Sequence, residues 1–263
     1  MEMKDYKDRR PPARQQADAP EGLIYGRNGV RELLKSGREI DKIMIRRGER
    51  EGSINVIVAE AAARGIPVVY VEKEKLDSLC RGGVHQGVAA FAAEKAYCST
   101  DDILDIAVQR GEKPFIVILD GVEDPHNLGA IIRSAECAGA HGVIIPKRRA
   151  SGLTSTVSKA SAGALEHIAV AKVTNLAAEV DRLKEKGVWI YSAEAGGDSI
   201  YEVDLDRPAA FILGSEGGGV SRLLKEKSDF TVSIPLHGKI NSLNVSAAAA
   251  VVLFEVAHRR TVQ

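Results

Sequence analysis

The sequence lacks the features that mark membrane, secreted and metal-binding proteins. Hydrophobic residues make up 44% of the chain, but no apolar run approaches the length of a membrane span. The N-terminus carries charges and prolines in place of an apolar core, so no signal peptide is expected. The three cysteines, Cys80, Cys98 and Cys137, have no metal-ligand spacing, so no metal site is expected. We interpret them as reduced thiols of a cytoplasmic protein.

Net charge is also absent, because 36 Lys and Arg residues balance 36 Asp and Glu residues. This balance does not predict a nucleic-acid-binding protein, but it hides an uneven distribution. Residues 22–95 hold thirteen basic and ten acidic side chains, and residues 147–149 read Lys-Arg-Arg. That basic run is equally well explained as a solvated surface or as a phosphate contact. An RNA partner is therefore allowed by the charges without being required by them.

Two familiar nucleotide-binding signatures are missing as well. No Gly-x-Gly-x-x-Gly sequence opens a helix after a first strand, and no Walker A lysine follows a glycine loop. The sequence therefore gives little support to a dinucleotide or ATP site.

Composition divides the 263 residues into four parts. Residues 1–21 are rich in proline, glutamine and charge, which predicts a disordered tail. Residues 22–95 alternate short strands and helices, which predicts a small α/β domain. Residues 96–113 are polar and are expected to connect it to a second domain, residues 114–263.

The second domain is also predicted to be α/β. The run FIVILD at 115–120 is continuously apolar, which is typical of a buried parallel strand. Strands and helices then alternate, which predicts a mostly parallel sheet covered on both faces. Ligands bind such sheets at the carboxyl ends of the strands. Three polar or glycine-rich clusters follow strands in this way, at residues 124–133, 214–219 and 234–244.

The last cluster leads into the C-terminal helix. Ser242 and Asn244 both stand where N-cap residues belong. The helix behind them is apolar almost all the way round, so it is expected to be buried. A helix N-terminus that opens onto a polar loop suits a negatively charged group. On this stretch alone, a well-capped core helix is the simpler interpretation.

Three further side chains are candidates for a site. Asn127 is expected to be a helix N-cap, whether or not it also contacts a substrate. Arg133 lies among apolar helix residues, so we expect it to be buried with a charged partner. Glu216 is the only carboxylate in its glycine loop and is the candidate partner. A structural pair and a functional pair both fit this pattern.

Three blocks in the second domain resemble a known family. The blocks NLGAIIRSAECAG, LGSEGGGVS and IPLHGKINSLNVSAAAAVVLFE resemble, in order and spacing, the three motifs of the SpoU (TrmH-type) RNA 2'-O-ribose methyltransferases of the SPOUT superfamily. The N-terminal blocks YGRNGVRELL and VHQGVAA resemble a ribosomal-protein-like substrate-binding domain. That domain occurs in the subgroup that methylates a guanosine of 23S ribosomal RNA.

The resemblance implies a fold, a cofactor and a partner. The second domain would contain a deep trefoil knot, with the last helix threaded through a loop. The methyl donor would be S-adenosylmethionine, and the enzyme would be a homodimer with its active site near the subunit contact. The resemblance assigns donor binding to Leu213, Gly214, Gly217, Ile234, Leu236, Ser242 and Leu243. It assigns catalysis or substrate positioning to Asn127, Arg133, Glu216, Ser242 and Asn244.

The implied reaction places a ribose 2'-hydroxyl in line with the donor methyl group, so positioning carries much of the rate. The family assigns the deprotonating role to Arg133. Because a guanidinium pKa lies above about 12, stabilisation of the forming alkoxide is an equally physical role. The attacked hydroxyl exists only in RNA.

Other functions remain open at this point. The alternatives are the same chemistry on transfer RNA or on another ribosomal RNA nucleotide, a non-catalytic RNA-binding protein, and a nucleotide-dependent transferase.

Overall fold

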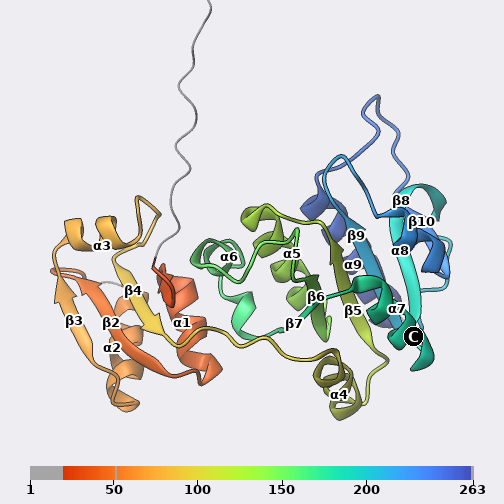
Figure 1. Cartoon of the computed structure of the whole chain (residues 1–263). Coiled ribbons are helices and arrows are strands. Elements are labelled where there is room, and N and C mark those ends of the chain that lie inside the picture. The colour runs from red at the N-terminus through yellow and green to blue at the C-terminus, as the bar shows by residue number, and fades with distance from the viewer. Residues whose placement is uncertain (1–19, 51, 262–263) are drawn as a thin grey trace, which may run out of the picture.

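The computed structural model describes residues 20–50 and 52–261. Nearly all of the predicted tail at 1–21 thus lies outside the described residues. The chain forms two α/β units, each built round its own sheet (Figure 1). Within the described residues, no helix has both the length and the apolar character that a membrane crossing requires.

The N-terminal unit is a mixed four-stranded sheet in the order β1-β4-β2-β3. Strand β4 pairs antiparallel with β1 and β2, and β2 pairs parallel with β3. The elements of this unit are β1 (Leu23–Tyr25), α1 (Arg27–Ser36), β2 (Ile40–Arg46), α2 (Ser53–Ala63), β3 (Val68–Val71), α3 (Lys73–Leu79) and β4 (Val88–Ala92).

The C-terminal unit is a six-stranded, wholly parallel sheet in the order β10-β8-β9-β5-β6-β7. The predicted α/β class with a mostly parallel second sheet is therefore confirmed. The elements are α4 (Thr100–Arg110), β5 (Phe115–Asp120), α5 (Pro125–Cys137), β6 (Gly142–Pro146), α6 (Ser155–Ala160), η1 (Ala164–Glu166), β7 (Ala169–Val173), α7 (Leu176–Glu185), β8 (Trp189–Ser199), β9 (Ala209–Gly214), α8 (Arg222–Lys227), β10 (Phe230–Ser233) and α9 (Val245–Thr261).

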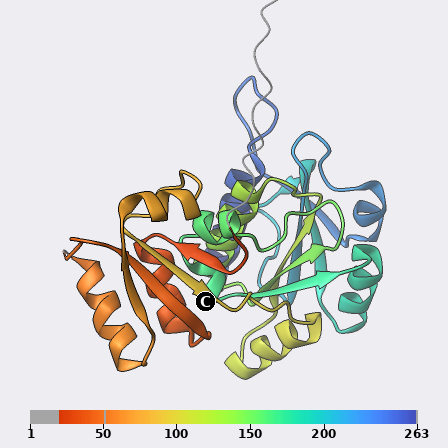
Figure 2. The ribbon, with the colours of Figure 1, turned by 60° about the vertical axis from the view of Figure 1, so that its left-hand side comes forward.

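Helices cover both faces of this sheet, as Figure 2 shows. Successive residues of a strand point to opposite faces. Val117 accordingly joins one buried cluster, with residues of α5, α6 and α9, whereas Ile116 joins a second, with residues of α4, α7 and α8. The sheet is thus the middle layer of three.

Much of the expected connector at 96–113 is a helix of the C-terminal unit. Ser99 and Asp102 form a capping box at the start of α4. Ile103 and Ala107 are fully buried, and Ile103 packs in the same cluster as Ile116. The polar composition of this stretch reflects only the exposed face of α4.

Helix α9 is buried on one face only, which corrects the expectation of a fully buried helix. Val245, Ala249, Val252 and Val256 are buried, and α9 lies against α5. The side chain of Phe254, on the opposite face, is 50% exposed. The apolar residues all round this helix therefore fill the core with one face and leave an apolar surface on the other.

The two units contact each other through α6 and η1, which pack on β1 and α1. Arg38 NH1 donates to both carboxylate oxygens of the buried Glu166, at 2.6 and 2.7 Å. Glu32 and the Nε2 atom of His167 lie 2.7 Å apart in the same contact. The N-terminal unit is thus held to the same side of the C-terminal sheet that α5 and α6 cover.

Candidate functional site

The three clusters predicted from the sequence meet at the carboxyl edge of the C-terminal sheet. Strands β5 and β9 are neighbours there, with Asp120 in register with Gly214. Helix α5 begins after β5, the loop 214–219 follows β9, and α9 begins beside α5. Segments more than a hundred residues apart are therefore brought to one place.

Asn127, Glu216 and Asn244 form a hydrogen-bonded triangle at this edge, one residue from each cluster. Asn127 Nδ2 donates to Glu216 Oε1 at 3.1 Å. Asn244 Nδ2 donates to Asn127 Oδ1 at 3.1 Å and to the same Glu216 oxygen at 2.5 Å. Asn127 is buried, whereas Glu216 and Asn244 are exposed. Two amides therefore fix one oxygen of a carboxylate whose other oxygen has no recorded partner among the described residues.

The helix starts differ from the sequence expectation at two of three positions. Helix α5 is capped by Asp124, whose Oδ1 accepts from His126 N at 2.8 Å, and Pro125 occupies its first position. Asn127 is therefore not a cap, which leaves its amide free for Glu216. Asn244 does cap α9, because its Oδ1 accepts from Ser246 N at 2.9 Å. Ser242 stands two residues before that cap and is exposed, and no capping hydrogen bond of its side chain is recorded among the described residues.

The loop 214–219 closes on itself. Ser215 and Gly219 exchange two backbone hydrogen bonds, of 3.2 and 3.0 Å. Asp120 Oδ2 accepts from Ser221 N at 2.8 Å, which ties the end of the loop to β5. A Cβ atom on Gly214 would lie 2.0 Å from the carbonyl carbon of Gly219. The loop itself therefore requires glycine at 214, whatever it binds.

A cleft of about 350 Å³ opens beside the triangle. Of its lining residues, Asn127 and Glu216 were predicted as site residues. Asp124 and Arg149 lie in stretches that the sequence had singled out, at 124–133 and 147–149, whereas Glu123 was missed. The cleft is lined by Gly121, Val122, Glu123, Asp124, Asn127, Arg149, Ser215, Glu216 and Val245.

The residues predicted to bind the donor divide into buried and exposed groups. Leu213 is a buried residue of the core, and the partly buried Ile234 packs against that core. Gly217 is exposed in its loop. Leu236 and Leu243 are 40% and 43% exposed. They belong to the loop between β10 and α9, which extends away from both sheets in Figures 1 and 2.

Arg133 is exposed, so the expectation of a buried arginine was wrong. Ile131, Ile132 and Ala135 of the same helix are fully buried, and Arg133 points away from them. The expected pairing with Glu216 is also wrong, because Glu216 bonds to the two asparagines instead. No ion pair of Arg133 is recorded within the described ranges, so its guanidinium is available to an incoming anion.

An open parallel sheet with a polar cluster and a cleft at the carboxyl ends of its central strands has the arrangement in which α/β proteins bind their ligands. Sequence comparison gives the class. Residues 114–254 match the SpoU rRNA Methylase family, and residues 23–98 match the family of RNA 2'-O ribose methyltransferase substrate binding. The chain belongs to the SpoU family and is an RNA 2'-O-ribose methyltransferase.

Relatives share the whole architecture. YacO of Bacillus subtilis (strain 168), assigned to the TrmH family of tRNA/rRNA methyltransferases, is 45% identical over 238 residues, which cover 90% of this chain and 95% of YacO. An AdoMet-bound rRNA methyltransferase from Sinorhizobium meliloti is 26% identical, with a TM-score of 0.74, and covers 92% of this chain and 87% of that one. The SpoU methyltransferase AviRb from Streptomyces viridochromogenes shares the fold, with a TM-score of 0.76 at 23% identity, over 92% and 91% of the two chains.

Proposed function

We propose that this enzyme transfers a methyl group from S-adenosylmethionine to the 2'-hydroxyl of a guanosine in 23S ribosomal RNA. The observation that carries the proposal is the triangle of Asn127, Glu216 and Asn244, because it joins the three motifs in one cluster beside a cleft. The S. meliloti relative, named as an rRNA methyltransferase, favours ribosomal RNA over transfer RNA. A cytoplasmic location belongs to the same proposal.

The donor site is proposed at the two loops beside the triangle. AdoMet is bound in the S. meliloti relative. When bound, this cofactor supplies a methyl group on a sulfonium, which is already a good electrophile. Leu236 and Leu243 offer exposed apolar surface for its adenosine part, and exposed glycines of the 214–219 loop allow close backbone approach. The residues proposed to hold it are Leu213, Gly214, Gly217, Ile234, Leu236, Ser242 and Leu243.

The chain's own side chains position the ribose. The fixed Glu216 carboxylate and the amides of Asn127 and Asn244 can accept from or donate to hydroxyls in the cleft. Arg133, which lacks an ion pair within the described residues, is proposed as a forked clamp on the forming alkoxide and its neighbouring phosphate. Ser242, which is exposed two residues before Asn244 in the same loop, is proposed to orient the substrate.

The homodimer is proposed from the exposed face of α9. Ala247, Val251 and Phe254 lie at positions i, i+4 and i+7, so they form one stripe on the side opposite the core. Exposed apolar stripes of this kind mark interaction sites. A second copy of the chain is the proposed partner, with the active site near the contact.

The trefoil knot stays a proposal as well. Strand β10 is at the edge of the sheet, yet the chain returns from it to cap α9 beside Asn127 of α5.

Residues 22–95 are proposed as the RNA-binding domain and residues 114–263 as the methyltransferase domain, with α4 packed on the latter.

The function is tested by methyl transfer in vitro. Purified protein, labelled S-adenosylmethionine and unmodified transcripts of 23S ribosomal RNA or of transfer RNA are combined, and alkali-resistant dinucleotides are analysed. The proposal expects a 2'-O-methylguanosine in the 23S transcript only. Methylation of transfer RNA alone would instead support a transfer RNA methyltransferase, the alternative that the tRNA/rRNA wording in the name of YacO leaves open.

A further inference from the structure

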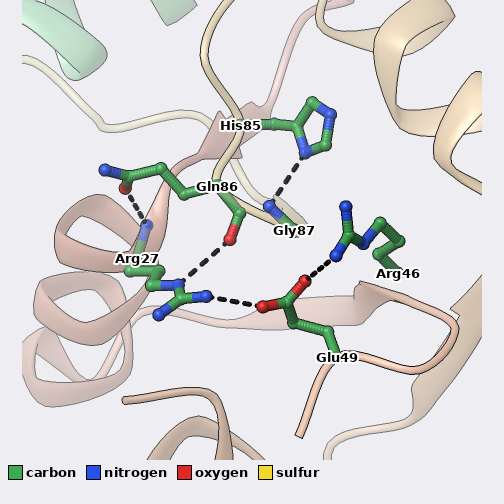
Figure 3. Close-up of a pocket in the computed structure, with 6 residues that line it drawn as sticks. All are labelled: Arg27, Arg46, Glu49, His85, Gln86 and Gly87. Atoms are coloured by element: carbon green, nitrogen blue, oxygen red, sulfur yellow. Dashed lines mark hydrogen bonds and ion pairs between the residues drawn. The ribbon is translucent and has the colours of Figure 1, made fainter. Parts of the chain in front are cut away.

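The N-terminal unit has a cleft of its own, of about 440 Å³ (Figure 3). It lies where the start of α1, the end of β2 and the loop before β4 meet. Its lining residues are Arg27, Arg46, Glu49, His85, Gln86 and Gly87. Two sequence blocks meet here that lie about sixty residues apart, YGRNGVRELL and VHQGVAA.

One carboxylate holds two guanidinium groups in this cleft. Glu49 Oε1 accepts from Arg27 NH2, and Glu49 Oε2 pairs with Arg46 NH2, both at 2.7 Å. The Glu49 side chain is only 14% exposed, whereas that of Arg46 is 42% exposed. In Figure 3, Arg46 is joined to Glu49 through one terminal nitrogen, and its other terminal nitrogen is free of the residues drawn. The cleft therefore keeps an uncompensated positive charge and unused N–H donors.

Gln86 shapes the same cleft from a strained backbone. Its φ angle is 53°, in the left-handed region that non-glycine residues rarely adopt. Its Oε1 accepts from Arg27 N at 2.9 Å, and its carbonyl accepts from Arg27 Nε at 3.1 Å. The side-chain amide nitrogen points away from Arg27 in Figure 3. Strained residues of this kind cluster at binding sites, where the surrounding contacts hold them.

A further cation, from the other unit, lies beside this cleft. Lys159 of α6 donates to the carbonyl of Val84 at 2.7 Å and lies 5.3 Å from the centre of the Tyr25 ring. A Cβ atom on Gly26 would lie 2.3 Å from Lys159 Nζ and 3.3 Å from Gln86 Oε1, so both groups face Gly26. No carboxylate is recorded with Lys159 in the part of the chain that the structure describes. Glu49 thus pairs with two arginines, and Lys159 adds a third positive charge beside them.

We propose that this cleft, with Lys159 at its rim, binds the backbone phosphates of the RNA substrate. The proposal rests on the function proposed above, and it gives the substrate a second contact, far along the chain from the methylation site. A planar guanidinium group that a carboxylate holds in place can donate hydrogen bonds to the oxygens of a phosphodiester. Because Lys159 is on α6, and α6 packs against α5, RNA held here is also fixed relative to Asn127. The two units therefore build the site together.

The test is the salt dependence of binding to a fluorescently labelled, mixed-sequence single-stranded RNA, measured by anisotropy with the full chain. Contacts to phosphate do not depend on sequence, and each one contributes roughly 0.7 to 0.9 to the slope of log K against log salt. Arg46→Gln and Lys159→Gln should each lower that slope by about this amount and weaken binding several-fold. Lys159→Arg, which keeps the charge, should retain the slope.

The matched control is Lys75→Gln. Lys75 is exposed on α3 of the same unit and does not line the cleft, so this variant removes the same charge elsewhere. It should leave the slope unchanged. Thermal melting separates lost contacts from lost folding, and donor affinity should be unchanged in every variant.

The proposal is overturned if Arg46→Gln and Lys159→Gln melt like the wild type and keep its slope. It is also overturned if Lys75→Gln lowers the slope as much as they do. Neither result depends on which RNA is methylated, because the probe carries no target site. An enzyme that modifies transfer RNA alone would refute the 23S assignment and leave this binding experiment intact.

Discussion

Replacement of Asn244 by alanine should cost both stability and activity, because one side chain does two things. Its Oδ1 caps α9 through Ser246 N and Ala247 N, at 2.9 and 3.3 Å. Its Nδ2 donates to Glu216 and to Asn127. Loss of a cap costs about 1 kcal/mol. Loss of a hydrogen bond to a charged group costs roughly 1.5 to 3 kcal/mol. Since Asn244 and Glu216 are exposed, the lower end applies, and about 2 to 3 kcal/mol is expected in total.

Asn244→Ser separates the two roles. A serine hydroxyl still caps the helix, but it is too short to replace both amide contacts. It should therefore recover about 1 kcal/mol of the stability lost in Asn244→Ala, as measured by urea unfolding monitored through helix content. Methyl transfer should stay at least tenfold below wild type in both variants, because the Glu216 carboxylate is then held by Asn127 alone. A serine variant with full activity, or an alanine variant with unchanged stability, would refute the reasoning.

Three other changes test separate parts of the account. Phe254→Asp should convert the proposed dimer to a monomer in light scattering; a dimer that persists in this variant would locate the subunit contact elsewhere. Arg133→Lys should lower activity by about 10²- to 10³-fold with no shift of the pH profile, since lysine lacks the planar fork; high activity with a lower pH optimum would identify Arg133 as the base. Burial lowers the pKa of His141 from 6.5, against the opposing effect of Glu112, so the unfolded chain binds more protons below that pH. Stability to urea should thus fall below about pH 6.5, and less so in His141→Gln.

The architecture could be predicted because it rests on local signals. The apolar run at 115–120 and the glycines that end helices were enough to give a parallel sheet with covered faces. The pattern of apolar residues along a helix predicts less well which side chains are buried. Helix α9 is apolar all round, yet among the described residues only one of its faces is buried. Arg133 has buried neighbours in sequence, but adjacent helix positions point about 100° apart, so it reaches solvent.

The sequence predicted which residues form the candidate site better than it predicted the contacts between them. The resemblance named Asn127, Glu216 and Asn244, and the structure brings them together. The pairing of Arg133 with Glu216 failed, because the sequence cannot show that two amides already satisfy that carboxylate. The cleft around Arg27 and Gln86 was missed, since its contacts join residues far apart in sequence. Such contacts arise only when the chain has folded.

The central claim is tested most directly by mapping 2'-O-methyl groups in the RNA of a strain that lacks this protein. We expect the loss of one methylated guanosine from 23S ribosomal RNA, its return with the wild-type chain, and no return with Arg133→Ala, produced at the same level. Unchanged 2'-O-methylation of 23S ribosomal RNA in the deletion strain would contradict the claim. A loss confined to transfer RNA would contradict it equally.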